Sequence, residues 1–374
     1  MSTLRTNLCD LLGIEHPILQ SGMGSVAGSD LVAEVSRAGG LGILGGVNIP
    51  PEELRKRIRA VRARTDRPFG LNLWLHTELQ PPADVARIPE PTVRAVQTTL
   101  NGFREHLGIP TTMAPPRQIG DFIGEAFNVM LEERVPVWSI GLGNPGRDMV
   151  DACHARGIKV VAMVATVDDA RGVAAAGVDA IVAQGGEAGG HRSTWVKPPS
   201  PEAANIGAIT LVPQVVDAVR VPVIAAGGIA DGRGLIAALA LGASGILLGT
   251  RFVATRESTA PEFWKKSLLE RGAETTSITD AFTGLYARAL SNTFTEQYRA
   301  AAAPVLPALV QSAAAQDVFV ASVEQRTGEF YPMWSGQSVG LIHNLPGAGE
   351  VVETIAREAR AVLDRLRRLS TAAS

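Results

Sequence analysis

The stretch DAIVAQGGEAGGHR, residues 179–192, joins an apolar run to a glycine-rich loop that ends on a histidine. The run at 179–183 is typical of a buried strand. We expect the loop to be flexible, and its glycines let the backbone approach a flat or anionic group because no Cβ is in the way. The imidazole of His191 can titrate near neutral pH and move protons. Taken alone, the loop fits either a surface turn or a functional site.

The same alternation of an apolar strand and a helix recurs through the first two thirds of the chain. Apolar runs predict strands that start near residues 16, 41, 68, 135, 159, 179, 221 and 244, and a helical pattern follows each of the first seven. Repeated β–α units with apolar strands indicate a parallel sheet. Eight such units favour a closed (β/α)8 TIM barrel over an open doubly wound sheet, so we predict an α/β fold of this kind.

A proline-rich segment at about 76–117 interrupts this alternation, with one expected helix at 92–106. A segment of this length between two strands predicts a lid, a binding loop or an insertion. After Arg251 the pattern becomes helical and polar, with expected helices at 261–272 and 295–315. An amphipathic helix is expected at 350–369. We therefore divide the chain into a barrel (1–255, with the insertion), a helical subdomain (256–330), and a return segment with a C-terminal helix that packs on the barrel (331–374).

The composition excludes several classes of protein. Hydrophobic residues make up 46% and charged residues 19%, with a formal net charge of −2, so no basic face for nucleic acid or anionic membrane is indicated. The most apolar stretch, 235–248, is too short to span a bilayer. The first twelve residues do not resemble a signal peptide, and two cysteines, Cys9 and Cys153, are too few for a disulfide framework. We expect a cytoplasmic protein.

Two further glycine loops follow the seventh and eighth expected strands. In a barrel the active site is built from loops at the carboxyl ends of the strands, and these two loops commonly hold a phosphate. They are AAGGI (225–229) and LLGTR (247–251). A tight turn would also explain the glycines, but their joint position predicts a phosphorylated ligand. FMN fits, with its phosphate here and its ring across the barrel mouth.

Other residues at the mouth have both a structural and a functional interpretation. The amides of Asn72 and Gln184 could bond a heterocycle or belong to a structural network. Met23 could pack on a flavin ring or fill a gap in the core. His76 and His343 are weaker candidates for the mouth. No pair of histidines, cysteines or carboxylates has the spacing of a metal site, so we predict a metal-free reaction that depends on a cofactor.

Several motifs resemble the nitronate monooxygenase family, long called 2-nitropropane dioxygenases. They are PILQSGM (17–23), AGGLG (38–42), QG-EAGGH (184–191), AGGI (226–229), GTRF (249–252), ARALSN (287–292) and WSGQ (334–337). The loop QSGM differs from the QAPM of the best-characterised bacterial members, and the insertion is longer than in the family. The same loop and barrel are also similar to FMN-dependent enoyl-ACP reductases and to flavin enzymes that act on acyl-CoA thioesters.

The resemblance implies an FMN-dependent enzyme that uses dioxygen to convert an alkyl nitronate, such as propionate 3-nitronate, into a carbonyl compound and nitrite. His191 matches the family's active-site histidine. The expected FMN contacts are Met23, Asn72, Gln184, Gly189, Gly190, Gly227, Gly228, Leu247, Leu248, Gly249, Thr250 and Gln337. The alternatives are an FMN-dependent reductase or dehydrogenase of enoyl thioesters that uses NAD(P)H, and a catalytically silent flavin- or phosphate-binding protein. We expect small-molecule partners only, with a homodimer as the candidate assembly.

Overall fold

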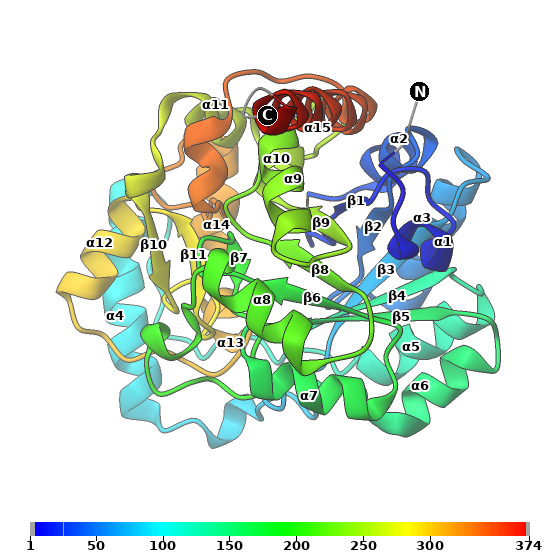
Figure 1. The fold of residues 1–374 in the computed structure, drawn as a ribbon. Coiled ribbons are helices and arrows are strands. Elements are labelled where there is room, and N and C mark those ends of the chain that lie inside the picture. The colour runs from blue at the N-terminus through cyan, green and yellow to red at the C-terminus, as the bar shows by residue number, and fades with distance from the viewer. Residues whose placement is uncertain (1–3, 25, 372–374) are drawn as a thin grey trace.

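Eight parallel strands form a barrel in the computed structural model, which describes residues 4–24 and 26–371 (Figure 1). In the order in which they pair, they are β1 (Ile18–Gln20), β9 (Gly245–Leu248), β8 (Val223–Ala226), β6 (Ala180–Gln184), β5 (Lys159–Val164), β4 (Val137–Gly141), β3 (Phe69–Trp74) and β2 (Gly42–Gly45). The barrel closes next to β2, where Gln20 N–H donates to Leu41 O at 2.9 Å and Leu41 N–H to Ile18 O at 3.0 Å. The predicted TIM barrel is therefore confirmed.

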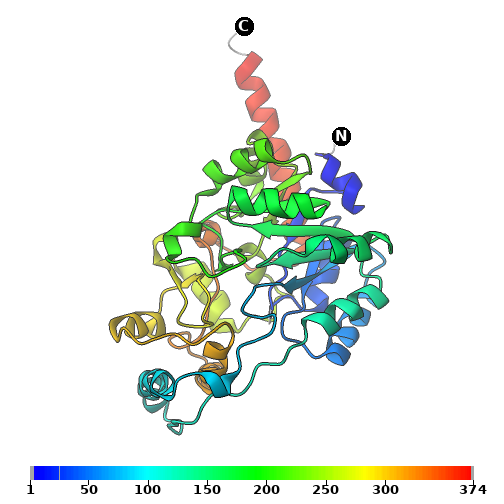
Figure 2. The ribbon, with the colours of Figure 1, turned by 90° about the horizontal axis from the view of Figure 1, so that it is seen from below.

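Helices surround the strands, and the helix expected after each of the first seven strands is present. These helices are α2 (Ser29–Arg37), α3 (Pro51–Arg62), α5 (Ile123–Glu132), α6 (Gly146–His154), α7 (Val167–Ala176), α8 (Ala208–Ala218) and α9 (Gly232–Ala240). The C-terminal helix α15 (Ala348–Thr371) packs against α2 and α9, and its far end extends beyond the barrel (Figure 2). None of the helices in the described part of the chain is long and apolar enough to cross a membrane.

A short helix that the sequence pattern did not predict fills the amino-terminal end of the barrel. This helix, α1 (Asn7–Leu12), contributes Leu8, Cys9 and Leu12 to a buried cluster that also contains the inward-facing side chains Leu19 and Ile224. The barrel interior is thus a packed core rather than a channel. The opposite end of the barrel remains open for a ligand.

The insertion shares its buried core with a later segment of the chain. Its helix α4 (Glu90–Leu107) packs against α14 (Gln316–Glu324), and one buried cluster joins side chains of 85–119 with side chains of 281–330. We call this second cluster the side lobe. Its aromatic centre consists of Phe103, Phe282, Phe294, Phe319 and Phe330. Two segments far apart in sequence therefore share one core.

The region after the barrel is less helical than expected. Strands β10 (Thr276–Thr279) and β11 (Ala287–Leu290) form an antiparallel sheet with β7 (Gly190–His191). The single helix predicted at 295–315 is wrong, because α12 (Thr293–Ala300) ends before a loop that contains Pro304 and Pro307. Proline lacks the N–H that a continuing helix needs. The remaining helices of this region are α10 (Thr250–Val253), α11 (Glu262–Glu270) and α13 (Val310–Ala314), and the 3₁₀ turns of the chain are Val85–Arg87, Pro201–Ala204, Ala273–Thr275 and Gln337–Leu341.

Arg104 fastens the insertion to the rest of the side lobe. Its guanidinium is 1% exposed and binds Asp317 through two bonds of 2.7 and 3.2 Å. It also donates to Ala314 O, Gln97 Oε1 and Asn101 Oδ1, each at 2.8 Å. These bonds link the insertion to the segment around Ala314 and Asp317. Loss of the guanidinium would leave several buried oxygen acceptors without a donor.

We predict that Arg104→Ala lowers the free energy of unfolding by about 2–4 kcal/mol, because buried acceptors lose their donor and the side chain leaves a void. The measurement is urea denaturation followed by circular dichroism. The control is Arg94→Ala on the same helix, whose arginine is exposed and pairs only with Glu90, so that the loss stays below about 0.5 kcal/mol. Equal effects of the two substitutions would contradict this role of Arg104.

Candidate active site

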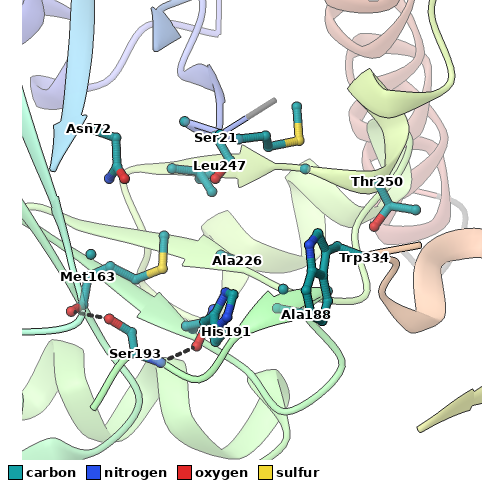
Figure 3. Close-up of a pocket in the computed structure, with 18 of the residues that line it drawn as sticks. Ser21, Asn72, Met163, Ala188, His191, Ser193, Ala226, Leu247, Thr250 and Trp334 are labelled. Atoms are coloured by element: carbon teal, nitrogen blue, oxygen red, sulfur yellow. Dashed lines mark hydrogen bonds between the residues drawn. The ribbon is translucent and has the colours of Figure 1, made fainter. Parts of the chain in front are cut away.

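The carboxyl ends of the strands open into one cavity of about 300 Å³ (Figure 3). Loops after β1, β3, β6, β8 and β9 line it, together with Trp334 and Ser338. The predicted residues that line it are Met23, Asn72, Gln184, Gly189, Gly190, His191, Gly227, Gly228, Leu247, Leu248, Gly249 and Thr250. Gln337 is not among the lining residues, and its backbone N–H donates to Glu187 O at 2.8 Å. The barrel thus brings together residues that are scattered in the sequence.

Two buried guanidinium groups hold the loop between β6 and β7. Arg192 donates to Gly185 O at 2.9 Å and to Ala188 O at 2.6 Å, and Arg288 donates to Gly186 O at 2.9 Å. Burial lowers the pKa of Arg192 to about 9, and it also lowers the pKa of Arg288. Gly190 and the residue after it pair with β11 in an antiparallel register. Instead of the flexible loop expected from its glycines, the structure shows a segment bonded at several points.

The glycines of this loop serve contacts within the protein as well as the cavity. A Cβ on Gly189 would lie 2.5 Å from Gly336 N and 2.6 Å from Ser335 C, so the two backbones touch. Gly336 N–H donates to Thr250 Oγ1 at 2.9 Å. That bond connects the end of β9 to the return segment. Because the Thr250 oxygen accepts from Gly336, its own proton is available to an acceptor in the cavity.

The loops after β8 and β9 present backbone donors to the cavity. Gly227 and Gly228 have φ of 102° and 71°, a conformation that other residues rarely adopt. In the part of the chain that the structure describes, no backbone hydrogen bond uses the N–H groups of Gly227, Gly228 and Gly249. A Cβ on Gly249 would meet no atom closer than Met23 Sδ at 3.7 Å, so this backbone faces open space. Such a set of N–H groups, with the Thr250 hydroxyl, fits a phosphate.

The amide side chains of Asn72 and Gln184 differ in which of their hydrogen-bonding atoms remain available to a ligand. Asn72 Nδ2 donates to Ser139 O and Oγ at 3.2 and 3.1 Å, which leaves its oxygen for a ligand in the cavity. Gln184 bonds His191 O and Ser193 N, both at 2.9 Å. Its structural role is therefore established by these bonds, and its second N–H and the second lone pair of Oε1 remain for a flavin ring. A contact between Gln184 and FMN stays a prediction.

His191 lies between two tryptophans in the wall of the cavity. Its ring centroid is 4.5 Å from that of Trp74 and 5.1 Å from that of Trp334, and Nε2 is 2.8 Å from Thr283 Oγ1. Burial lowers the pKa of His191 to about 3, and Arg192 contributes in the same direction. The imidazole is therefore neutral over the whole neutral pH range.

Several residues of this site were missed by the sequence pattern. Trp74 and Thr283 contact the histidine, while Met163 and Ser193 line the cavity (Figure 3 shows the last two). They approach from four different segments, and no local motif marks them. The weaker histidine candidates behave differently from His191: His76 is buried without lining the cavity, and His343 is exposed.

The lining of the cavity contains no lysine, arginine, aspartate or glutamate in the described part of the chain. The free backbone amides suit a phosphate, the amide oxygen of Asn72 suits a donor on a flavin ring, and the aromatic rings near His191 suit a flat apolar group. Glu187, the one carboxylate of the glycine-rich loop, bonds Ala208 N at 3.0 Å through both oxygens. The residues present therefore fit a flavin nucleotide.

Comparison with known proteins agrees with this geometry. The family model described as nitronate monooxygenase matches residues 5–358. The chain belongs to the nitronate monooxygenase family. It is 31% identical over 362 residues to a probable nitronate monooxygenase of Staphylococcus saprophyticus, covering 97% of this chain and 99% of the relative. A second relative of that description, from Staphylococcus haemolyticus, is 34% identical and covers 89% of this chain and 91% of the relative.

Two solved structures are similar to this chain over nearly its whole length. A nitroalkane oxidase from Streptomyces ansochromogenes is 32% identical with a TM-score of 0.87, covering 96% of this chain and 99% of that one. FabK from Thermotoga maritima is also 32% identical, with a TM-score of 0.75 and coverage of 98% and 99%. As a member of the nitronate monooxygenase family, the protein is an oxidoreductase, and the family is one of flavin-dependent enzymes.

We predict that Gly189→Ala weakens flavin binding about tenfold or more, because the new Cβ must push the loop away from the return segment, at a cost of about 1–3 kcal/mol. The measurement is quenching of FMN fluorescence on titration with apoprotein. Gly102→Ala on α4, where a Cβ meets no atom within 4 Å, is the control and should leave the affinity unchanged. An unaltered affinity in the Gly189 variant would show that this backbone contact does not shape the site.

Proposed function

We propose that the protein is an FMN-dependent enzyme that uses dioxygen to oxidise alkyl nitronates or nitroalkanes to a carbonyl compound and nitrite. The observation that carries this proposal is a neutral histidine between two tryptophans in an uncharged cavity, beside a glycine cradle suited to a phosphate. Membership of the nitronate monooxygenase family supports it. The nitroalkane oxidase from Streptomyces ansochromogenes, similar over nearly the whole chain, adds further support.

The protein's part in FMN binding is divided between two ends of the cavity. The N–H groups of Gly227, Gly228 and Gly249, with the Thr250 hydroxyl, would hold the phosphate. Asn72 would accept from the ring. When bound, FMN supplies electron transfer that no side chain can perform.

His191 would act as the base for a neutral nitroalkane. Thr283 Oγ1 lies within 3.4 Å of Leu285 O and 2.8 Å of His191 Nε2. When the threonine donates to that carbonyl, it accepts the proton on Nε2, and Nδ1 carries the lone pair. The free nitrogen can then take a proton from the carbon that bears the nitro group. A substrate supplied as the nitronate needs no such transfer, and His191 would serve to orient it.

A second candidate is a reductase or dehydrogenase of enoyl thioesters that uses NAD(P)H. The similarity to FabK over 98% of this chain favours it, and so does the resemblance to FMN-dependent enoyl-ACP reductases. The two candidates share the flavin site and differ in what reduces the flavin. Membership of a family of oxidoreductases argues against the catalytically silent alternative. Cytoplasmic location and a homodimeric assembly remain predictions.

We predict that His191→Ala, purified with FMN bound, loses nitroethane turnover by about two orders of magnitude, because the α-proton then lacks its acceptor. Nitrite release is the measurement, and flavin content is determined for each preparation. His343→Ala, which alters an exposed histidine away from the cavity, should retain full activity. Unchanged turnover in the His191 variant would remove this residue from the mechanism.

A further inference from the structure

A narrow second cavity adjoins the main one on the side of the insertion. Its volume is about 30 Å³, against about 300 Å³ for the main cavity. The residues that line both are Val47, Asn48, Trp74 and Leu309. Trp74 also lies against His191, with ring centroids 4.5 Å apart. The small cavity, which we call the side slot, is therefore separated from the reactive histidine by little more than one side chain.

The side slot is apolar. Its other walls are Leu73, Leu79, Pro82, Ile119, Phe122, Ile123 and Ala126, with the backbones of Gly46 and Gly120. Leu73, Leu79, Ile119 and Ala126 are buried. Asn48 is the single polar side chain in this lining, and it is exposed. A hydrocarbon group would contact mainly carbon there, whereas a charged group would find no partner of opposite charge.

The insertion supplies Leu79 and Pro82 to the wall of the side slot, and the segment that follows it supplies Ile119, Gly120 and Phe122. Hydrogen bonds hold both parts of this wall in place. Gln118 accepts from Val85 N at 3.0 Å and donates to Ala83 O at 2.9 Å. The Glu78 carboxylate accepts from Ala308 N at 3.0 Å, next to the shared wall residue Leu309. These bonds tie the wall to the folded side lobe, so a ligand meets a formed slot rather than a loop that must first be ordered.

We propose that the side slot binds the far end of an unbranched alkyl tail of the substrate, while the reactive head lies in the main cavity beside His191. This inference rests on the proposed function for the identity of the head group. A cavity of about 10–15 Å³ holds one water-sized group, so the slot has room for about two or three carbon atoms in line. A slot of this volume leaves little room for a branched tail, and the residues that line it determine the specificity in this way.

The first test compares a homologous series of primary nitroalkanes, from nitroethane to 1-nitrohexane, with 4-methyl-1-nitropentane as the member that is branched at the far end of its tail. For each methylene that enters the slot, kcat/KM should rise about fourfold, which corresponds to about 0.8 kcal/mol. The rise should stop once the slot is full. Calorimetric titration of the FMN-loaded protein with each nitroalkane, in the absence of oxygen, gives its Kd. The dependence of Kd on chain length is thus measured independently of turnover.

Two variants should change the series in opposite directions. Ile123→Trp puts a larger ring at a half-buried position of the wall and should flatten the series to the level of nitroethane, which does not reach the slot. Phe122→Ala widens the slot and should move the plateau to a longer chain. Ile209→Trp, at a position 73% exposed on α8, is the matched control and should leave the series as in the wild type.

The possible outcomes separate this inference from the proposed function. Turnover of nitroethane with no dependence of kcat/KM or Kd on chain length would overturn the side slot and leave the proposed function intact. Absence of turnover with every nitroalkane and with the corresponding nitronates would overturn the proposed function, while the calorimetric series would still decide the slot. A rise with chain length that Ile123→Trp does not remove would place the tail elsewhere and overturn the inference.

Discussion

The backbone carbonyl groups of the loop after β6 accept hydrogen bonds from two buried arginines, and the arrangement of the active site depends on these bonds. Arg192 binds Gly185 O and Ala188 O, and Arg288 binds Gly186 O from the neighbouring strand β11. His191 directly precedes Arg192, so the anchor that fixes the loop also fixes the imidazole. Two cations without a carboxylate bonded to them are costly to bury. Their position at this loop is therefore a constraint on function rather than a source of stability.

The side lobe also helps to hold the loop after β6 at the barrel mouth. Strand β11 belongs to the segment that packs with the insertion, and it pairs with Gly190 and His191. The return segment reaches the loop from another direction, with Gly336 against Gly189 and Trp334 against His191. The histidine is thus neutral because protein from several parts of the chain surrounds it, so one ring nitrogen keeps its lone pair at neutral pH, while a pKa of about 3 makes it a weaker base than a free imidazole.

The barrel could be predicted from the sequence because each of its units carries a local signal. Apolar runs and helical spacing recur in each unit, and the glycine loops after β6, β8 and β9 lie at the ends of those runs. The partners of His191 could not be predicted in this way, since Trp74 and Thr283 acquire their roles only through contacts across the fold. The error at 295–315 is of another kind, because Pro304 and Pro307 were visible signals against a continuous helix.

The central claim is that this cavity holds FMN for the oxidation of a nitronate, and it is tested most directly by what reduces the bound flavin. The FMN-loaded protein is mixed without oxygen with propionate 3-nitronate and, separately, with NADPH, and the visible absorbance of the flavin is followed. The account predicts rapid loss of the oxidised flavin spectrum with the nitronate and none with NADPH. Rapid reduction by NADPH with no response to the nitronate would contradict it and favour the enoyl-thioester reductase.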